Sequence, residues 1–306
     1  MTLYKKEVKM KRLVVCGATG KQGGSLVEAM RDLEGWELCG FSRDVDSDRA
    51  KNLKSKGIEV DRADPEDLDS LIRVFKGADC VFGVTQPWNK AYTKCDTHSE
   101  LKQGKNIIDA CKKVDVGHLV LSTAAHMTDE KIGLPHVDIK IDIELYAKQN
   151  DVPATILKPA QFMDNVGMKF LPVKKGKVRG FIAGDAKVPY VATKDIGIFA
   201  RTAFENPEEY LGNEVKLIGD FVSGHELAGM MGKIRNEKFK YSAVPKWIIW
   251  LYSREFYVMR MAFEEFARSE SADSIPSEIE KCRQIDPALM SMEKYLLTMN
   301  WDSRFL

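Results

Sequence analysis

The chain has 306 residues, which is enough for one large domain or for a domain with a smaller lobe. Its 46 Lys and Arg residues nearly balance 45 Asp and Glu residues, and 44% of the residues are hydrophobic. This composition excludes a disordered acidic chain and argues against a strongly basic nucleic-acid-binding protein. We therefore expect a small-molecule or protein partner, and neither nucleic acid nor a membrane.

The cysteines and the apolar stretches indicate where the protein works. The six cysteines are widely spaced, without a CxxC pair or a Cys/His cluster, so we expect reduced thiols and no metal site. The apolar stretch after the basic N-terminus, residues 13–16, is too short for a secretion signal, and residues 247–252 are too short to span a membrane. We expect a cytoplasmic protein, and a nuclear location is compatible with the same features.

Short apolar runs alternate with amphipathic stretches in the first half of the chain, a pattern that predicts a parallel sheet covered by helices. We expect strands at residues 13–16, 37–42, 58–60, 79–85, 119–122 and 154–157. We expect helices at residues 22–33, 48–56 and 100–113, and another that starts at Asp64-Pro65. Residues 136–147 alternate like a strand, but two parallel strands need a crossover between them, so we predict a helix there.

The regular alternation fades beyond Pro159. Residues 181–191 predict a hairpin that turns at Gly184-Asp185, and Thr193 and Ser223 predict helix starts. Residues 247–266 are rich in aromatic residues, and they indicate either a core helix or a wall of a ligand cleft or partner surface. The fold class is therefore α/β, a Rossmann doubly wound parallel sheet with a smaller mixed α+β C-terminal lobe.

The same pattern suggests domain limits. We expect an N-terminal tail at residues 1–10, a dinucleotide-binding domain at residues 11–160, and a smaller substrate or partner lobe at residues 161–306. Some segments of that lobe are expected to return to the sheet of the first domain.

A glycine-rich loop follows the first predicted strand. It predicts a phosphate-binding turn in which backbone N–H groups approach a pyrophosphate at a helix N-terminus. The alternative is a purely structural glycine turn, but the position between a strand and a helix favours nucleotide binding. The candidate phosphate-binding residues are Gly17, Thr19, Gly20, Lys21, Gln22 and Gly23.

The tip of the second predicted strand indicates which dinucleotide binds. Ser42 is followed by Arg43, whose guanidinium would pair with the 2′-phosphate of NADP, whereas a carboxylate there would favour NAD. The alternative is an ordinary solvated arginine. Asp44, Asp46 and Asp48 follow closely and reduce the positive field at Arg43. The sequence therefore predicts a preference for NADP(H) over NAD and leaves the size of that preference open.

Two further strand ends are expected to flank the nicotinamide, because ligands bind at the carboxyl ends of parallel strands. Gln86 follows the fourth strand, and Gln161 and Phe162 follow the sixth. An aromatic side chain at this place, such as Phe162, is equally consistent with ordinary packing in the protein interior.

In combination these residues resemble the NmrA-like family of atypical short-chain dehydrogenases, especially its redox-sensing NADP-binding members. The resemblance covers residues 14–24, 42–43, 64, 82–88, 136–140, 159–165, 195–197 and 301–306. It implies that Arg43 binds the 2′-phosphate, that Asp64 lies on the adenine side, and that Thr85 lies near the nicotinamide ribose. Where those members have a second basic residue after the arginine, this chain has acidic residues.

A working short-chain dehydrogenase needs a Tyr as proton donor and a Lys four residues later. The spacing occurs at Tyr190 and Lys194, but the residues between them favour a strand end, so we interpret it as chance. At the expected place stand His136 and Lys140. Lys140 is expected to bind the ribose or to form a surface pair with Glu144. His136 is a candidate proton donor, and the alternative is a capping or solvated residue at the helix start.

Two functions follow. The first is an NADP(H)-binding redox sensor or regulator with little or no dehydrogenase activity and with a regulatory protein partner. The second is an NADPH-dependent reductase of quinones or ketones, in which Lys140 or His136 assists proton delivery. An interaction protein that has lost its nucleotide is disfavoured by the glycine loop and Arg43. A monomer and a homodimer are both compatible with the sequence.

Overall fold

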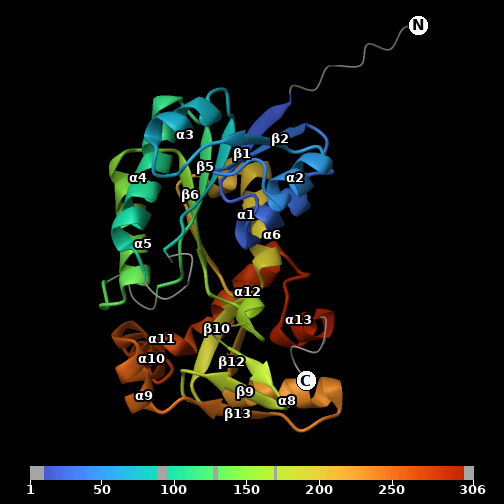
Figure 1. The fold of residues 1–306 in the computed structure, drawn as a ribbon, viewed down its shortest axis with the longest axis vertical. Helices are drawn as coiled ribbons and strands as arrows, with labels where there is room; N and C mark the ends of the chain where they lie inside the picture. Colours follow the sequence, from blue (N-terminus) through green and yellow to red (C-terminus); the bar gives the residue numbers. More distant parts are fainter. Residues whose placement is uncertain (1–9, 88–94, 127–129, 169–170, 300–306) are drawn as a thin grey trace, which may run out of the picture. The chain divides into compact units, whose positions relative to one another are not determined.

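The computed structural model describes residues 10–87, 95–126, 130–168 and 171–299 (Figure 1). The chain divides into two compact units, and it passes between them several times. The first unit takes in the chain up to Thr123, Asp142–Leu157 and Gly197–Val215; the second comprises Ala124–Ile141, Lys158–Ile196 and Lys216–Leu306. Residues 88 and 301–306, which contributed to the family resemblance, lie outside the described residues. The expected domain limits at residues 10 and 160 stay predictions.

The first unit is built on a seven-stranded sheet with the strand order β11-β6-β5-β4-β1-β2-β3. The pairs β1–β2, β2–β3, β1–β4, β4–β5 and β5–β6 are parallel, as the alternating pattern predicted. In this order β1 lies between β2 and β4. The chain therefore adds β2 and β3 on one side of β1 and β4 to β6 on the other, so that the strand order reverses at β1. The strands are β1 Lys11–Val15, β2 Trp36–Ser42, β3 Glu59–Arg62, β4 Cys80–Val84, β5 His118–Ser122, β6 Ala154–Pro159 and β11 Glu214–Leu217.

Helices cover both faces of this sheet, with α3, α4 and α5 on one face and α1, α2 and α6 on the other (Figure 1). The apolar sides of α3, α4 and α5 pack with the strands in one buried core that includes Leu71, Phe75, Ile107 and Leu121. The doubly wound α/β fold class is therefore confirmed. The helices are α1 Lys21–Met30, α2 Asp48–Ser55, α3 Leu68–Phe75, α4 Thr97–Lys113, α5 Pro135–Gln149, α6 Thr193–Glu205 and the short α7 Pro207–Tyr210.

Helix α3 starts later than the sequence predicted. The side chain of Asp67 accepts hydrogen bonds from the N–H groups of Asp69 and Ser70, so Asp67 is the N-terminal cap. Pro65 lies in the turn before this cap and is not the first helical residue. The expected start at Asp64-Pro65 was wrong because two Asp residues compete as caps and Asp67 has the capping geometry.

Helix α5 confirms the helix predicted for residues 136–147 against their alternating pattern. The carboxylate of Asp138 accepts the N–H groups of Ile132 and Gly133, each at 2.9 Å, which fixes the chain ahead of the helix. Further along, Ile143 packs against Gly104 of α4, where any β-carbon would lie 2.7 Å from the Ile143 side chain. The crossover topology therefore outweighed the local pattern.

The second unit contains two three-stranded sheets, with the orders β12-β10-β7 and β13-β9-β8. Helix α8 starts with the predicted capping box, in which Ser223 and Glu226 exchange hydrogen bonds. The strands are β7 Gln161–Phe162, β8 Val173–Lys174, β9 Lys177–Gly180, β10 Lys187–Val191, β12 Asp220–Ser223 and β13 Lys240–Ala243. The helices are α8 Gly224–Arg235, α9 Lys246–Tyr252, α10 Arg254–Phe266, α11 Glu270–Asp273, α12 Ile275–Ile285 and α13 Met292–Thr298, with a 3-10 turn at Met163–Asn165.

The hairpin predicted at residues 181–191 is not present. Gly184 and Asp185 do form a turn, but residues 181–183 are not a strand, and β10 pairs with β7 and β12 instead. The hairpin in this region joins β8 and β9 through Lys175 and Gly176, which both have positive φ angles, 49° and 66°. The prediction failed because β9 ends at Gly180 and pairs with β8 and β13, so no strand leads into the turn at Gly184.

Residues 247–266 form two helices with different environments. Met259 and Phe266 of α10 are buried, as expected of a core helix, but α9 buries Ile249 and leaves Trp247 and Trp250 exposed. The core interpretation is therefore wrong for α9. Within the described parts of the chain, no helix has both the length and the apolar character needed to cross a membrane.

Candidate functional site

The loop after β1 is a tight turn that leads directly into α1. Gly17 has a φ of 64°, in the left-handed region that favours glycine, and the N–H of Gly20 donates to the carbonyl oxygen of Gly17 at 2.7 Å. Helix α1 begins at the next residue, Lys21, with no side-chain cap on its N-terminus. The first-turn N–H groups of such a helix are oriented to bind an anion.

Gly23 allows this helix to pack on the turn. A β-carbon at Gly23 would overlap the carbonyl oxygen of Gly17, so a larger residue cannot occupy this place without moving the turn. The glycine is thus required by close backbone packing as well as by any ligand. Thr19 is half-buried beside it, and Lys21 is exposed at the start of α1.

Gln22 has a partner that the sequence did not indicate. The hydroxyl group of Ser122, the last residue of β5, donates to the Gln22 side-chain oxygen at 2.7 Å. The two residues are 100 positions apart, and Ser122 follows an ordinary apolar strand, so no local signal marked it. The contact connects the glycine loop with the end of β5.

Arg43 lies at the end of β2, and its side chain is exposed. No ion pair joins Arg43 to a carboxylate within the described part of the chain, although three aspartates follow. Asp44 instead accepts the N–H of Asp46 through its side chain, and its backbone is bonded to the Ser42 hydroxyl. The aspartates therefore shape the turn after β2 and leave the guanidinium available to an anionic ligand.

Asp64 follows β3 in a loop that is held by Ser70 of α3. The Ser70 hydroxyl group donates to the Asp64 carbonyl oxygen and accepts the Asp64 N–H, while the Asp64 carboxylate accepts the N–H of Glu66 at 3.0 Å. These hydrogen bonds hold the loop at the position where the resemblance places the adenine.

Thr85 and Gln86 follow β4 and are bonded to α4. The hydroxyl group of buried Thr85 donates to Glu100 at 2.8 Å, and Glu100 is itself fully buried. The N–H of Gln86 donates to Gln103 at 3.1 Å. Glu100 is a further residue that the sequence analysis missed, since its position on an amphipathic helix is typical of a surface carboxylate.

Hydrogen-bonded side chains connect the end of β4 with the end of β3. The Gln103 amide group donates to the Ser99 hydroxyl at 3.0 Å, and Ser99 donates to Glu66 at 2.6 Å. The loops after β3 and β4 are thereby linked. Together with the glycine loop, Arg43 and Ser122, they form a row of polar groups at the carboxyl ends of five strands, β1 to β5.

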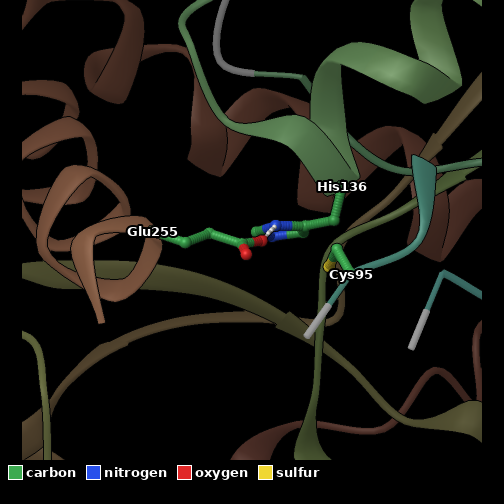
Figure 2. A group of neighbouring side chains, drawn as sticks. All are labelled: Cys95, His136 and Glu255. Carbon is green, nitrogen blue, oxygen red and sulfur yellow. Dashed lines mark hydrogen bonds and ion pairs between the residues drawn. The ribbon is translucent and has the colours of Figure 1, made fainter. Parts of the chain in front are cut away.

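The second unit holds the remaining candidate residues. His136 lies at the start of α5, and its Nδ1 atom is 2.8 Å from Glu255 Oε1 on α10. Figure 2 shows the imidazole ring directed at this carboxylate. Glu255 was not identified from the sequence, because 119 residues separate it from His136. The expectation of a merely solvated or capping histidine is wrong, since the ring is half-buried and within hydrogen-bond distance of Glu255.

Lys140 lies one helical turn after His136 on α5 and is buried. Glu144 is buried as well, so the alternative of an exposed surface pair between the two is wrong. A buried lysine requires a polar environment, which is consistent with a functional role.

Gln161 and Phe162 form the short strand β7, which pairs with β10. The side-chain oxygen of Gln161 is buried without a hydrogen-bond partner in the described residues. Gln161 also lines a small cavity of the second unit, beside Asn165, Phe181, Ile182, Tyr190 and Tyr241. An unsatisfied acceptor in such a wall is suited to a ligand that donates a hydrogen bond.

Tyr190 and Lys194 do not form a catalytic pair on one helix. Tyr190 lies in β10, where burial raises the pKa of its hydroxyl group, and Lys194 lies in the first turn of α6. The two residues therefore lack the common helical face that a Tyr-x-x-x-Lys site requires, as their local sequence had indicated.

The comparisons with known proteins agree with this geometry. The NmrA-like family profile matches residues 9–296. The chain belongs to the NmrA-like family. An NmrA-like family domain-containing protein of Dictyostelium discoideum is 26% identical over 95% of this chain and 98% of its own length. The family oxidoreductase FrzB of Cladobotryum sp. is 26% identical over 77% of each chain.

Solved structures show the same NmrA fold. The structure of NmrA, described as a negative transcriptional regulator in complex with NADP, aligns with a TM-score of 0.74 at 17% identity and covers 95% of each chain. At this identity the likeness concerns the fold, and the ligand is a property of that protein.

Proposed function

We propose that this NmrA-like protein binds NADP(H) and acts as a redox sensor or regulator with little or no dehydrogenase activity. The observation that carries the proposal is the uncapped N-terminus of α1 behind the Gly17–Gly20 turn, together with the exposed Arg43 at the next strand end. Backbone N–H groups and a guanidinium suit a pyrophosphate and a 2′-phosphate respectively.

The chain's own residues fit the parts of a dinucleotide. The first turn of α1, with Thr19, Lys21 and Gln22, would hold the pyrophosphate, Ser42 and Arg43 the 2′-phosphate, and Asp64 the adenine side. Thr85 and Gln86 would hold the nicotinamide ribose. Lys140, Gln161 and Phe162 belong to the second unit and stay predicted cofactor contacts. The bound group supplies a hydride when it is reduced.

The proposed lack of dehydrogenase activity rests on the residue that precedes Lys140 by one helical turn. A tyrosine there is the proton donor of short-chain dehydrogenases, and this chain has His136. The similar NmrA is described as a transcriptional regulator, which supports a regulatory role for this fold. We propose a regulatory protein partner and a cytoplasmic or nuclear location for this chain.

Titration calorimetry with NADP, NADPH and NAD tests the proposal directly. We expect NADP and NADPH to bind more tightly than NAD, because Arg43 gains a charge-assisted hydrogen bond only with the 2′-phosphate. A sensor also requires that the oxidised and reduced forms differ in effect, measured as different protease protection of the two complexes. Absence of binding by all three nucleotides would refute the proposal.

The His136–Glu255 pair favours a second candidate, an NADPH-dependent reductase of quinones or ketones. A carboxylate that orients an imidazole is a common arrangement for a histidine that transfers protons. Relatives of this chain are named oxidoreductases, which is consistent with this candidate. In this case His136 would deliver a proton to the reduced oxygen, and Glu255 would hold the ring.

An NADPH-oxidation assay over quinones and ketones separates the two candidates. If the reductase is correct, turnover falls by about 10²-fold or more in His136→Ala, the usual contribution of a general acid. Glu255→Gln would lower kcat by a smaller factor and change the pH profile, because the ring stays but loses its charged partner. His98→Ala, which removes another histidine, is the control. No turnover with any acceptor leaves the sensor as the function.

A further inference from the structure

One face of the β13-β9-β8 sheet carries only basic and neutral side chains. Lys240 of β13 and Lys174 of β8 both lie opposite Lys177 of the central strand β9. The three lysines therefore form one row across the sheet, and all are exposed while the alternate residue Val178 is buried. Arg179, two residues along β9, lies on the same outer face, opposite Ser242.

Further basic residues adjoin this row. Lys175 occupies the β8–β9 turn, and Lys238 lies beside it, since its carbonyl oxygen borders Gly176. None of these six basic side chains forms an ion pair with a carboxylate in the parts of the chain that the structure describes. Like charges placed opposite one another destabilise a sheet, so the row is not explained by the stability of the fold. We call this surface, residues 174, 175, 177, 179, 238 and 240, the basic face.

Helix α9 follows β13 and presents apolar side chains to solvent. Trp247, Trp250, Leu251 and Tyr252 are 65%, 59%, 67% and 72% exposed, while Ile249 is buried. At about 100° per residue, Trp247 and Leu251 project from the side opposite Ile249. The exposed side chains therefore form a convex ridge, and large exposed apolar surfaces of this kind mark interaction sites.

The ridge is held in place by buried charges. Lys246, the first residue of α9, is 2.9 Å from Glu264, and the same carboxylate binds Arg260 at 2.6 Å. Arg260 also donates to the carbonyl oxygen of Val244, in the link between β13 and α9. Helix α9 is thus fixed with its tryptophans outward.

The ridge and the basic face belong to the same end of the second unit, where Figure 1 shows β9, β13 and α9. Two residues, Val244 and Pro245, separate the end of β13 from the start of α9. At no more than about 3.6 Å per residue, the helix starts within about 11 Å of the strand end.

We propose that this end of the second unit binds an anionic membrane surface, with the ridge of α9 inserted at the headgroup level and the basic face against the anionic lipids. Trp and Tyr concentrate at membrane interfaces, and clustered Lys and Arg bind anionic lipid headgroups. The ridge of α9 and the basic face lie at the same end of the second unit, and both would contact the same membrane surface.

Other partners fit the surface less well. A single-stranded nucleic acid needs aromatic side chains on the charged face for base stacking, and the exposed residues of these strands are Lys, Arg and Ser. A folded protein would need a groove that matches the convex ridge, whereas a bilayer interface needs no matching shape. The expectation of no membrane rested on apolar stretches too short to span one, and a surface that binds headgroups needs no spanning helix.

Sedimentation of the full chain with vesicles tests the inference, which does not depend on cofactor binding. We expect binding to phosphatidylcholine vesicles that contain phosphatidylserine, weak binding to phosphatidylcholine alone, and loss of binding at high salt. The emission of Trp247 and Trp250 should shift to shorter wavelength on binding. Absence of sedimentation with the anionic vesicles would overturn the proposal.

Two variants separate the contributions. Lys174→Ala/Lys177→Ala/Lys240→Ala should weaken binding to the anionic vesicles at least about tenfold. Trp250→Ser/Leu251→Ser should also weaken it about tenfold and reduce the emission shift. The control Lys76→Ala/Lys113→Ala/Lys294→Ala removes three exposed lysines elsewhere and should bind like the unaltered protein. An equal loss of vesicle binding in the control variant would contradict the assignment of binding to the basic face.

Two further outcomes would also overturn the membrane assignment. Tight binding to single-stranded DNA without vesicle binding would assign the basic face to nucleic acid. A dimer in light scattering that the Trp250→Ser/Leu251→Ser variant abolishes, with no vesicle binding, would assign the ridge to a second copy of the chain. Circular dichroism of each variant establishes that the fold is retained, and the salt dependence and emission shift of the unaltered protein test the proposal without any variant.

Discussion

The Ser122 hydroxyl group and the Gln22 side-chain oxygen lie 2.7 Å apart, although Ser122 ends β5 and Gln22 lies in the first turn of α1. Strand β4 separates β5 from β1 in the sheet, so the contact spans the carboxyl end of a whole strand. It fixes the Gln22 side chain at the mouth of the glycine loop. The position of Gln22, a predicted phosphate contact, is thereby determined by a strand outside the glycine loop.

Ser122→Ala should weaken NADP binding about fivefold, because a hydrogen bond worth about 1 kcal/mol that orients Gln22 is lost. The free energy of unfolding should fall by no more than about 1 kcal/mol, since only this one hydrogen bond is lost. Calorimetry on the variant measures the effect. Ser55→Ala, which removes a local surface hydrogen bond from α2, is the control, and equal affinities for both variants would argue against a positioning role.

Arg43→Ala should abolish the preference for NADP over NAD. A charge-assisted hydrogen bond contributes about 1.5–3 kcal/mol, so the affinity for NADP should fall about 10- to 100-fold while that for NAD stays constant. The matched control is Arg49→Ala, an exposed arginine of α2. An equal loss of affinity for NADP and for NAD in Arg43→Ala would mean that Arg43 supports the fold of the loop and does not bind the 2′-phosphate.

Gly23→Ala should disrupt the glycine loop, because its β-carbon would overlap the Gly17 carbonyl oxygen. We expect loss of NADP binding and a fall in stability of about 1–3 kcal/mol, the usual cost of overpacking. Gly229→Ala in α8 is the control, since no atom lies within 4 Å of the added carbon. Normal cofactor affinity in Gly23→Ala would show that the phosphate site has been assigned to the wrong turn.

The parts of the fold and of the site that the sequence predicted are those with a local cause or with a general rule of chain topology behind them. The glycine loop, the Ser223 capping box and helix α5 follow from neighbouring residues and from the right-handed crossover. Glu255, Ser122 and Glu100 were missed because their partners lie 119, 100 and 15 residues away, and nothing in their own neighbourhood distinguishes them from surface or strand residues. The sequence left the environment of Trp247 open between a core helix and a partner surface, because apolar composition does not distinguish the two. Only the packing of Ile249 shows which side of α9 faces inward.

Asp195, in the first turn of α6, is almost fully buried and accepts the Met290 N–H at 3.1 Å. Burial raises the pKa of its carboxyl group to about 6, the Met290 hydrogen bond and Lys194 lower it, and the nearby Asp286 and Asp164 raise it. The folded state therefore holds this proton more tightly than the unfolded state, whose pKa is near 3.8. The contribution of Asp195 to stability falls as the pH rises from about 4 to about 6, and stays low above that range.

Asp195→Asn should therefore stabilise the protein near neutral pH by on the order of 1–3 kcal/mol, since the amide still accepts the Met290 N–H without a buried charge. At a pH of about 3 the unaltered carboxyl group is mostly protonated in both the folded and the unfolded state, so the two proteins should unfold at similar denaturant concentrations. Urea unfolding at both pH values measures the difference. Asp48→Asn, an exposed aspartate in the first turn of α2, is the control and should show no such pH-dependent gain. A loss of stability in Asp195→Asn that is equal at both pH values would mean that the ionised carboxylate stabilises the fold, contrary to the burial of Asp195 beside two other aspartates.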